Sequence, residues 1–367
     1  MRFLEIISGW VNRYFSDEEA IFLILLLLLT GLFLFMLGDS LAPVFTGLIL
    51  AFLLTGMVDR LKAFRVPETL AVGVSFAFFL AAMLTVLLFM VPLLIRQTRA
   101  LVGAVPDIMV QLRHGAQQLV DRFPDLVTEA QFSQWLESIG GQLGSWSTTV
   151  LELVVGQVPS LVGLLIYLVL VPISVFFMLK DRVALLRFAL SLLPERRPLL
   201  NRVGAEMNVQ LINYVRGKFI EILLVGATTF VGFSLLGLNY AALLGFLVGL
   251  SVLVPYIGAA VVTIPVALVG LLQFGWTWDF AWIMILYGVI QAIDGNILVP
   301  VLFSEAVDLH PLTIIVAVLA FGGLWGFWGV FFAIPLATLI KAIYNAWPRE
   351  ESVVMEARTP RREAAGR

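Results

Sequence analysis

A single carboxylate lies inside a long apolar stretch of this chain. Residues 281–346 are mostly apolar, yet they include Gln291, Asp294 and Asn296. A charge near the centre of a bilayer costs about 3 kcal/mol or more, so such a residue normally faces a bundle interior or a watery cavity and marks a pathway. Gln291 and Asp294 are three residues apart and share one face of a helix. Asp294 is therefore the first candidate for binding an ion, a proton or a substrate, with Gln291 and Asn296 beside it.

Asp294 also has a purely structural interpretation. A protonated carboxyl group, or one that is hydrogen-bonded to a neighbouring helix, could serve packing alone. The adjacent Gly295 has no side chain, so it would let another backbone or a ligand come close to this position.

The composition requires a membrane around this carboxylate. The sequence is 60% hydrophobic and 13% charged, and its mean hydropathy is +1.00. A soluble core of this size cannot hide so many apolar residues, so we expect an all-α polytopic membrane protein with six to eight transmembrane segments. There is no Cys, which excludes disulfides and thiolate chemistry. The first nineteen residues lack a basic region followed by a cleavage site, so no cleaved signal peptide is expected.

Changes in composition divide the chain into five regions. The first contains an apolar hairpin over residues 20–58 that is expected to turn at the sequence GDSLAP. The regions are residues 1–95, the N-terminal transmembrane spans; 96–157, an extracytoplasmic domain of amphipathic helices; 158–218, a span followed by cytoplasmic interfacial helices with a break at PERRP; 219–346, the transport half; and 347–367, a disordered cytoplasmic tail.

The distribution of basic residues predicts the topology. Placing both termini in the cytoplasm puts nineteen of the 23 Lys and Arg residues inside and four outside, as in a multi-pass protein of the bacterial inner membrane. Between residues 219 and 340 there is no Lys or Arg at all, although acids are present. A bound cation or proton is then a natural counter-charge for the intramembrane acids. Glu221 is the exception, because Lys218 lies one helical turn away, where an interfacial ion pair is expected.

Two segments of the transport half are too long for one crossing and too broken for one helix. Residues 241–272 are interrupted at Pro255 to Gly258, and residues 312–345 are interrupted at Gly322 to Gly329. Their pieces of about 10 to 16 residues span roughly 15 to 24 Å, against a hydrocarbon core of about 30 Å. The segments also resemble one another, GAAVVTIPVAL against GVFFAIPLATL.

These breaks predict two re-entrant hairpins in an internal repeat, an architecture typical of secondary transporters. The alternative is two long, tilted and kinked helices. In the hairpin interpretation, Pro255, Gly258, Gly322 and Gly323 present backbone groups to a substrate beside Asp294, and Pro300 belongs to the same site.

Several motifs make the chain recognisable as a whole. They are IDGNILVP at residues 293–300, LHPLTII at 309–315 and FGGLWGFWGVFFAIPLATL at 321–339, with GDSLAP, FFMLKDR and VPYIG upstream. This pattern resembles the autoinducer-2 exporter (AI-2E) family and, within it, the PerM-type permeases. The resemblance implies export of small molecules, autoinducer-2 in the case that names the family, and cation/proton antiport in some relatives. Many family members carry Glu where this chain has Asp294.

Other chemistry has no support in the sequence. There is no GxxxxGK[ST] phosphate loop and no HExxH motif, so neither an enzyme nor a cofactor is expected. With only His114 and His310 a multi-histidine metal site is excluded. Glu305, Asp308 and His310 could be proton-linked; alternatively, His310 caps or borders the helix that follows it.

Together these features predict a secondary transporter, a permease or exporter of small molecules that is coupled to protons or cations through Asp294. The alternative is a membrane scaffold without transport activity. The expected partners are a small-molecule or ion substrate, the lipid bilayer and further copies of the chain, joined through the N-terminal spans; nucleic acid is not expected.

Overall fold

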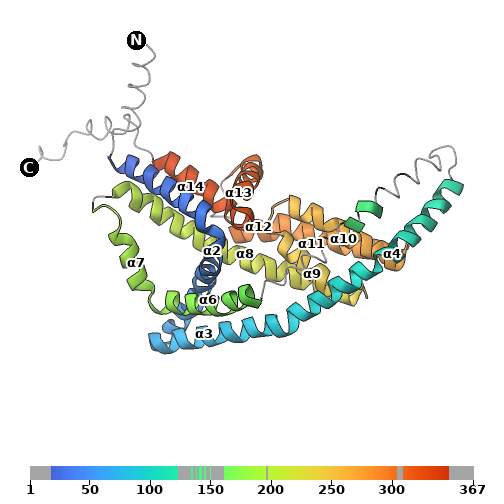
Figure 1. Ribbon diagram of the computed structural model, residues 1–367, viewed down its shortest axis with the longest axis horizontal. Helices are drawn as coiled ribbons and strands as arrows, with labels where there is room; N and C mark the ends of the chain where they lie inside the picture. Colours follow the sequence, from blue (N-terminus) through green and yellow to red (C-terminus); the bar gives the residue numbers. More distant parts are fainter. Residues whose placement is uncertain are drawn as a thin grey trace, which may run out of the picture. The chain divides into compact units, whose positions relative to one another are not determined.

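The computed structural model describes residues 18–122, 161–195, 197–303 and 309–346, with a few single residues between 134 and 149. Every regular element in these ranges is a helix (Figure 1). Eight of the described helical segments are long and apolar enough to cross a membrane. The chain is therefore an all-α, multi-pass membrane protein. Its elements are α2 (Glu18–Ala63), α3 (Glu68–Thr85), the π-helix η1 (Val86–Met90), α4 (Val91–Arg122), α6 (Leu161–Lys180), α7 (Arg182–Ser191), α8 (Pro198–Leu235), α9 (Ala241–Ser251), α10 (Ile257–Phe274), α11 (Trp278–Ile293), the π-helix η3 (Asp294–Leu298), α12 (Val299–Phe303), α13 (Pro311–Phe331) and α14 (Ala333–Ala346).

These helices group into two compact units. Unit 1 comprises Met1–Ala42, Asp181–Tyr214 and Glu305–Arg367, and unit 2 comprises Pro43–Lys180 and Val215–Ser304. Asp294 and the α9–α10 segment belong to unit 2, whereas α13 and α14 belong to unit 1.

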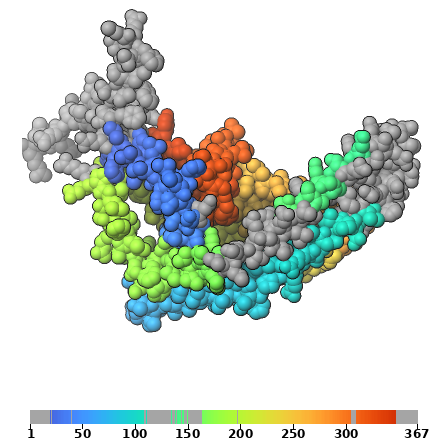
Figure 2. Space-filling model, viewed as in Figure 1, coloured from blue at the N-terminus to red at the C-terminus, as the bar shows by residue number. Residues whose placement is uncertain are grey.

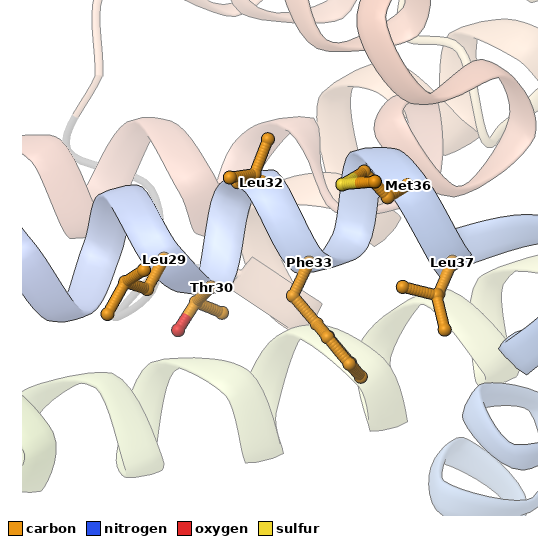
Figure 3. A pocket seen from close by; sticks show the side chains of 6 residues that line it. All are labelled: Leu29, Thr30, Leu32, Phe33, Met36 and Leu37. Atoms are coloured by element: carbon orange, nitrogen blue, oxygen red, sulfur yellow. The ribbon is translucent and has the colours of Figure 1, made fainter.

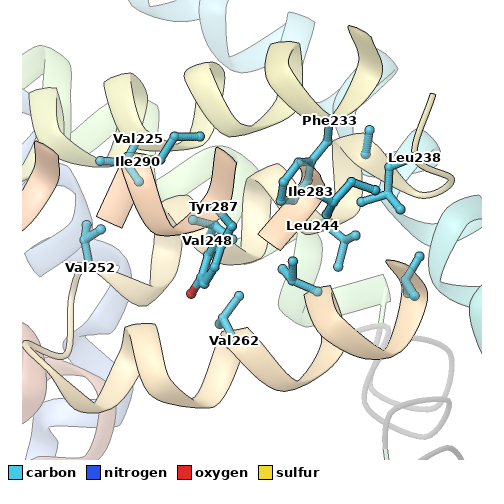
Figure 4. Close-up of a cluster of buried hydrophobic side chains, with 13 residues drawn as sticks. Val225, Phe233, Leu238, Leu244, Val248, Val252, Val262, Ile283, Tyr287 and Ile290 are labelled. Carbon is cyan, nitrogen blue, oxygen red and sulfur yellow. The ribbon is translucent and has the colours of Figure 1, made fainter. Parts of the chain in front are cut away.

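The first core of unit 2 is built from α8, α9, α10 and α11. Its thirteen buried residues are almost all aliphatic, with Phe233 and Tyr287 as the aromatic members (Figure 4). The α8 and α9 backbones approach closely, because a Cβ at Gly249 would lie 2.8 Å from the carbonyl oxygen of Ile222. Small residues permit this kind of close packing between membrane helices.

A second core of unit 2 joins the C-terminal half of α2 to α3 and α6. It includes Ala51 on α2, Phe79 on α3 and Val175 on α6. Figures 1 and 2 show α3 and α4 as one long rod, because η1 continues the helix between them. The boundary expected at residue 95 is therefore not a break in the helix. The second amphipathic helix expected in the 96–157 region lies mostly outside the described residues.

Unit 1 buries the apolar stripe at the start of α8. Leu199, Val203 and Met207 pack with Leu23 of α2 and Ala342 of α14. The break at PERRP is confirmed, since α7 ends at Ser191 and α8 begins at Pro198. The apolar stripe of this stretch faces protein, and α8 continues without interruption into the apolar segment that follows. Its expected position at the membrane surface stays a prediction.

The N-terminal hairpin is also absent. Residues 38–43, which read GDSLAP, are helical and lie inside α2, a helix of 46 residues with Pro43 in its interior. In an apolar environment every unpaired backbone group costs several kcal/mol, so a continuous helix outweighs the turn preference of Gly, Asp and Ser.

Candidate functional site

The α9–α10 segment of unit 2 is a helical hairpin. α9 has 11 residues, about 16 Å of helix, which is too short to cross a hydrocarbon core of about 30 Å. A Cβ at Gly258, near the start of α10, would overlap the carbonyl oxygen of Ser251 at the end of α9. The two helices can therefore meet beneath the tip only because residue 258 is glycine.

Both ends of this hairpin are held by side chains. At its base, the Oε1 atom of Gln97 accepts a hydrogen bond of 2.7 Å from the amide of Leu243. The Oε1 atom of Gln273 accepts one of the same length from the amide of Asn239. At its tip, the Nζ atom of Lys218 donates to the carbonyl oxygen of Val252 at 2.7 Å. The hairpin is thus fixed at three points in unit 2.

The tip itself has a strained backbone. Tyr256 has φ 63° and ψ −51°, and the amide of Ile257 bonds to the carbonyl of Pro255 at 2.7 Å. This is the geometry of the rare γ-turn, which a bulky residue adopts only at a cost. Such strain is concentrated at ligand-binding and switching sites.

Unit 1 contains a second break of the same kind. Within α13, Trp325 (φ −128°, ψ 15°) and Gly326 (φ 56°, ψ −132°) are not helical, and α13 packs against α14. A Cβ at Gly329 would overlap the carbonyl oxygen of Phe321. Gly329 is the residue that the sequence repeat pairs with Gly258, so both members of the repeat place a glycine against a backbone carbonyl of the preceding helix.

Asp294 lies at the start of a π-helix. α11 ends at Ile293, and η3 adds the wider turn that begins with Asp294. Ile283, Tyr287 and Ile290 occupy the buried face of α11, and Asp294 continues that face into the core of unit 2. Single π-helical turns inside α-helices occur frequently at functional sites.

The carboxylate of Asp294 is buried and incompletely satisfied. The residue is 8% exposed, and its Oδ1 atom has no hydrogen-bond partner among the described residues. The Nε2 atom of Gln291, three residues earlier, is likewise buried without a partner there. Buried polar groups are normally paired, so the unpaired carboxylate oxygen of Asp294 indicates a place for a polar ligand, an ion or a proton.

Two further charged residues lie in the same core. Lys218 and Glu221 of α8 are 3% and 1% exposed, and their Nζ and Oε2 atoms are 2.8 Å apart. Asp294 belongs to the same unit as both residues. We call Lys218, Glu221 and Asp294 the charge cluster. The ion pair expected between Lys218 and Glu221 is confirmed, and it is buried within the protein. Its expected position at the cytoplasmic edge of the membrane stays a prediction.

The remaining predicted residues near Asp294 are not buried with it. Asn296 is exposed, and its Nδ2 atom donates to the carbonyl of Ala292 one turn earlier. Pro300 is exposed as well. No protein atom lies within 4 Å of a Cβ built at Gly295, so no second backbone approaches there in the described structure.

The four hairpin residues divide between the units. Pro255 and Gly258 belong to unit 2 with Asp294, and Gly322 and Gly323 belong to unit 1. A meeting of both hairpin tips beside Asp294 stays a prediction. Glu305 and Asp308 lie outside the described residues.

His310 is the N-cap of α13. Its Nδ1 atom accepts a hydrogen bond of 3.2 Å from the amide of Leu312. The capping interpretation of this histidine is confirmed.

A shallow apolar groove lies on the N-terminal half of α2 and contains no residue of the charge cluster. Figure 3 shows its six lining residues, all on α2, and the hydroxyl of one threonine is their only polar group: Leu29, Thr30, Leu32, Phe33, Met36 and Leu37. Such a groove fits lipid or another helix and offers nothing to a charged ligand.

Lys218 and Glu221 were missed as site residues by sequence reasoning. Their spacing places them on one face of a helix, and Lys218 is the last basic residue before a stretch without any that ends at residue 340. These two sequence features could have identified the pair as candidate site residues. Their burial depends on how α9 and α12 pack against α8, which no local pattern reveals.

The chain is similar in sequence to known membrane transport proteins. A model described as AI-2E family transporter matches residues 21–349. The protein named "Putative permease PerM" of Escherichia coli strain K12 is 44% identical over 345 residues, which cover 94% of this chain and 98% of that protein. "Putative transport protein YueF" of Bacillus subtilis strain 168 is 26% identical and covers 82% of each chain. The chain therefore belongs to the AI-2E family of transporters.

Proposed function

We propose that this chain is a secondary transporter of the bacterial inner membrane, a permease or exporter of small molecules that is coupled to a proton or a cation at Asp294. One observation carries the proposal: a buried carboxylate with an unpaired oxygen, in the unit that also contains a helical hairpin. Intramembrane acids are expensive and are typical of ion and substrate pathways.

The architecture supports the same conclusion. Short helices that break within the membrane region expose backbone groups, and transporters use such breaks to bind substrates and ions. The strained tip at Tyr256 and the paired glycines Gly258 and Gly329 fit this use. The names of the relatives, permease and transport protein, favour flux of solutes over catalysis.

The decisive experiment replaces the carboxylate by its neutral isostere. We expect Asp294→Asn to abolish solute or ion transport in reconstituted vesicles. The amide keeps the size and hydrogen bonding of the side chain, but it cannot carry a proton or balance a cation. Asp294→Glu should retain part of the activity. A screen of solutes and cations with the unaltered protein supplies the assay.

Asp279→Asn is the matched control. Asp279 lies in the first turn of α11, the helix that leads directly to Asp294, but it is exposed. This variant should transport normally. Full activity of Asp294→Asn, with expression and oligomeric state unchanged, would contradict the proposal, and absence of flux from the unaltered protein across the whole screen would favour a membrane scaffold.

A further inference from the structure

The base and the tip of the α9–α10 hairpin are held in different ways. At the base, the side chains of Gln97 and Gln273 accept hydrogen bonds from the amides of Leu243 and Asn239. These amides lie in or just before the first turn of α9, where a helix has no internal acceptor for them. The base bonds therefore satisfy groups that would otherwise be unpaired, and they anchor the hairpin.

One arm of the tip is held by Lys218 of α8. Its Nζ atom donates to the carbonyl oxygen of Val252, directly after α9, at 2.7 Å. The same atom lies 2.8 Å from the Oε2 atom of Glu221 and 5.2 Å from the centroid of the Phe303 ring, a cation–π distance. Two of the three contacts of the ammonium thus lie on α8 and α12, so Lys218 stays in place if the hairpin arm moves away.

The other arm of the tip is held by Tyr287 of α11. Its buried hydroxyl donates to the carbonyl oxygen of Ala259, in the first turn of α10, at 2.8 Å. The Oγ1 atom of Thr263 lies 2.8 Å from that carbonyl oxygen and 3.1 Å from the Tyr287 hydroxyl. Because Thr263 can bond to either group, the bond between Tyr287 and Ala259 can break without leaving both partners unpaired.

The backbone between these two points is strained, and its apex is not packed. Tyr256 has φ 63° and ψ −51°, and both Tyr256 and Ile257 are exposed within the described structure. Such a conformation persists only where the surrounding structure enforces it. Since the apex itself is exposed, the bonds at Val252 and Ala259 are the side-chain contacts that hold the turn closed.

We propose that Lys218 and Tyr287 form a double latch on the hairpin tip, and that residues 253–258 open as a unit when the latch releases while the base stays bound. Opening frees the carbonyl oxygen of Val252 and relaxes the turn at Tyr256. The latch thus sets how often backbone groups of the tip become accessible. This inference concerns the movement of the hairpin and does not depend on what Asp294 binds.

A single buried cysteine at the tip reports opening in the full-length protein in detergent. Leu253 is buried next to Val252, and the native chain has no Cys. In Leu253→Cys the thiol reacts with a small thiol reagent only when the tip opens, so the rate of modification follows the open population. Val266→Cys, at a fully buried position further along α10, reports loosening of the helix itself.

Removing either half of the latch should speed modification at position 253 and leave position 266 unchanged. We expect a rise of about 2- to 10-fold with Tyr287→Phe, because a neutral hydrogen bond contributes modestly to stability. We expect about 10- to 100-fold with Lys218→Met/Glu221→Gln, because bonds from charged donors are stronger. The double substitution removes the ammonium without leaving its carboxylate partner behind.

Tyr214→Phe is the matched control. The Tyr214 hydroxyl also donates to a backbone carbonyl oxygen, that of Phe331, at 2.8 Å, but in unit 1. This variant should leave the rates at both positions unchanged.

Three outcomes would overturn the proposal. An unchanged rate at position 253 in Tyr287→Phe would show that the bond does not hold the tip. An equal rise at positions 253 and 266 would show that the two bonds stabilise the whole core and not the tip. A rise at position 253 in Tyr214→Phe as large as that in Tyr287→Phe would remove the specific role of Tyr287. If the double variant does not fold, Tyr287→Phe alone decides among these outcomes.

Discussion

The ion pair of Lys218 and Glu221 illustrates how a buried charge depends on its partner. Taking both groups out of water is costly, and their mutual attraction offsets this cost only while both are present. We expect Lys218→Met or Glu221→Gln alone to lower the free energy of unfolding by about 3 to 5 kcal/mol, because each removes one member of a buried ion pair and leaves the other without it. Denaturation of purified protein in one detergent measures this loss.

The double variant Lys218→Met/Glu221→Gln is the control for that prediction. It removes both charges together, so it should be more stable than either single variant. The exposed pair of Lys62 and Glu68, 3.2 Å apart, offers a second comparison, and breaking it should cost at most about 1 kcal/mol. Losses in the two single variants that simply add in the double variant would show that the buried groups do not act as a pair.

At the residue scale, the sequence was sufficient to find Asp294 but not its surroundings. A lone acid in an apolar run is visible in composition, and burial of Asp294 agrees with that hypothesis. The depth of Lys218 and Glu221 is set by tertiary contacts with Val252 and Phe303, which are 34 and 85 residues from Lys218 in the chain. Asn296 is exposed and donates to the carbonyl of Ala292, so its expected role beside the carboxylate stays a prediction.

At the scale of elements, the two hairpins depend on equivalent glycines. We expect Gly258→Ala and Gly329→Ala each to destabilise the protein by about 1 to 3 kcal/mol, because the added methyl group overlaps a backbone carbonyl that cannot move without displacing a helix. Unfolding midpoints and the rate of transport should fall together if the hairpins form part of the site.

Gly288→Ala on α11 and Gly323→Ala on α13 are matched controls, since no atom of the described residues outside the local helix backbone lies within 4 Å of a Cβ at either position. Alanine there should leave stability unchanged or raise it slightly, because it lowers the entropy of the unfolded chain. Equal tolerance of alanine at all four positions would argue against close packing of the hairpins.

The elements that sequence reasoning missed share one cause. GDSLAP looks like a turn by local preference, and residues 198–218 look like a surface helix by their charges. In the structure both stretches continue as helix, within α2 and α8. Helix continuity keeps every backbone group paired away from water, and this advantage exceeds the preferences of single turn residues. The two breaks were predictable because proline and glycine interrupt a helix and are visible in the sequence. Pro255 lies at one break and Gly326 at the other.

At the scale of the whole molecule, the N-terminal half of α2 indicates assembly. Leu28, Phe35 and Met36 are among many large apolar side chains that this half exposes within unit 1. We expect a homo-oligomer that forms through these residues, and Met36→Gln should weaken it by placing an amide in an apolar contact. Light scattering in mild detergent measures the mass. A monomer that retains full transport activity would reject this proposal and assign the surface to lipid.

The membrane topology distinguishes re-entrant hairpins from full crossings. Thr277 lies between Trp276 and Trp278, which are 84% and 79% exposed, as expected for aromatic side chains at a membrane surface. If both hairpins are re-entrant and the termini are cytoplasmic, the loop around Thr277 lies outside and Ser304 lies inside; with full crossings their sides are reversed. The native chain has no Cys, so single cysteines report each side without background.

We expect Thr277→Cys to react with an impermeant thiol reagent in intact cells, and Ser304→Cys to react only after permeabilisation. In that arrangement α9, about 16 Å long, enters and leaves on one side with α10, and both hairpin tips reach the depth of Asp294. Backbone groups at Pro255, Gly322 and Gly323 could then contact a substrate there. Labelling of position 304 from outside, with position 277 protected, would eliminate the re-entrant hairpins and, with them, the placement of the binding site at their tips.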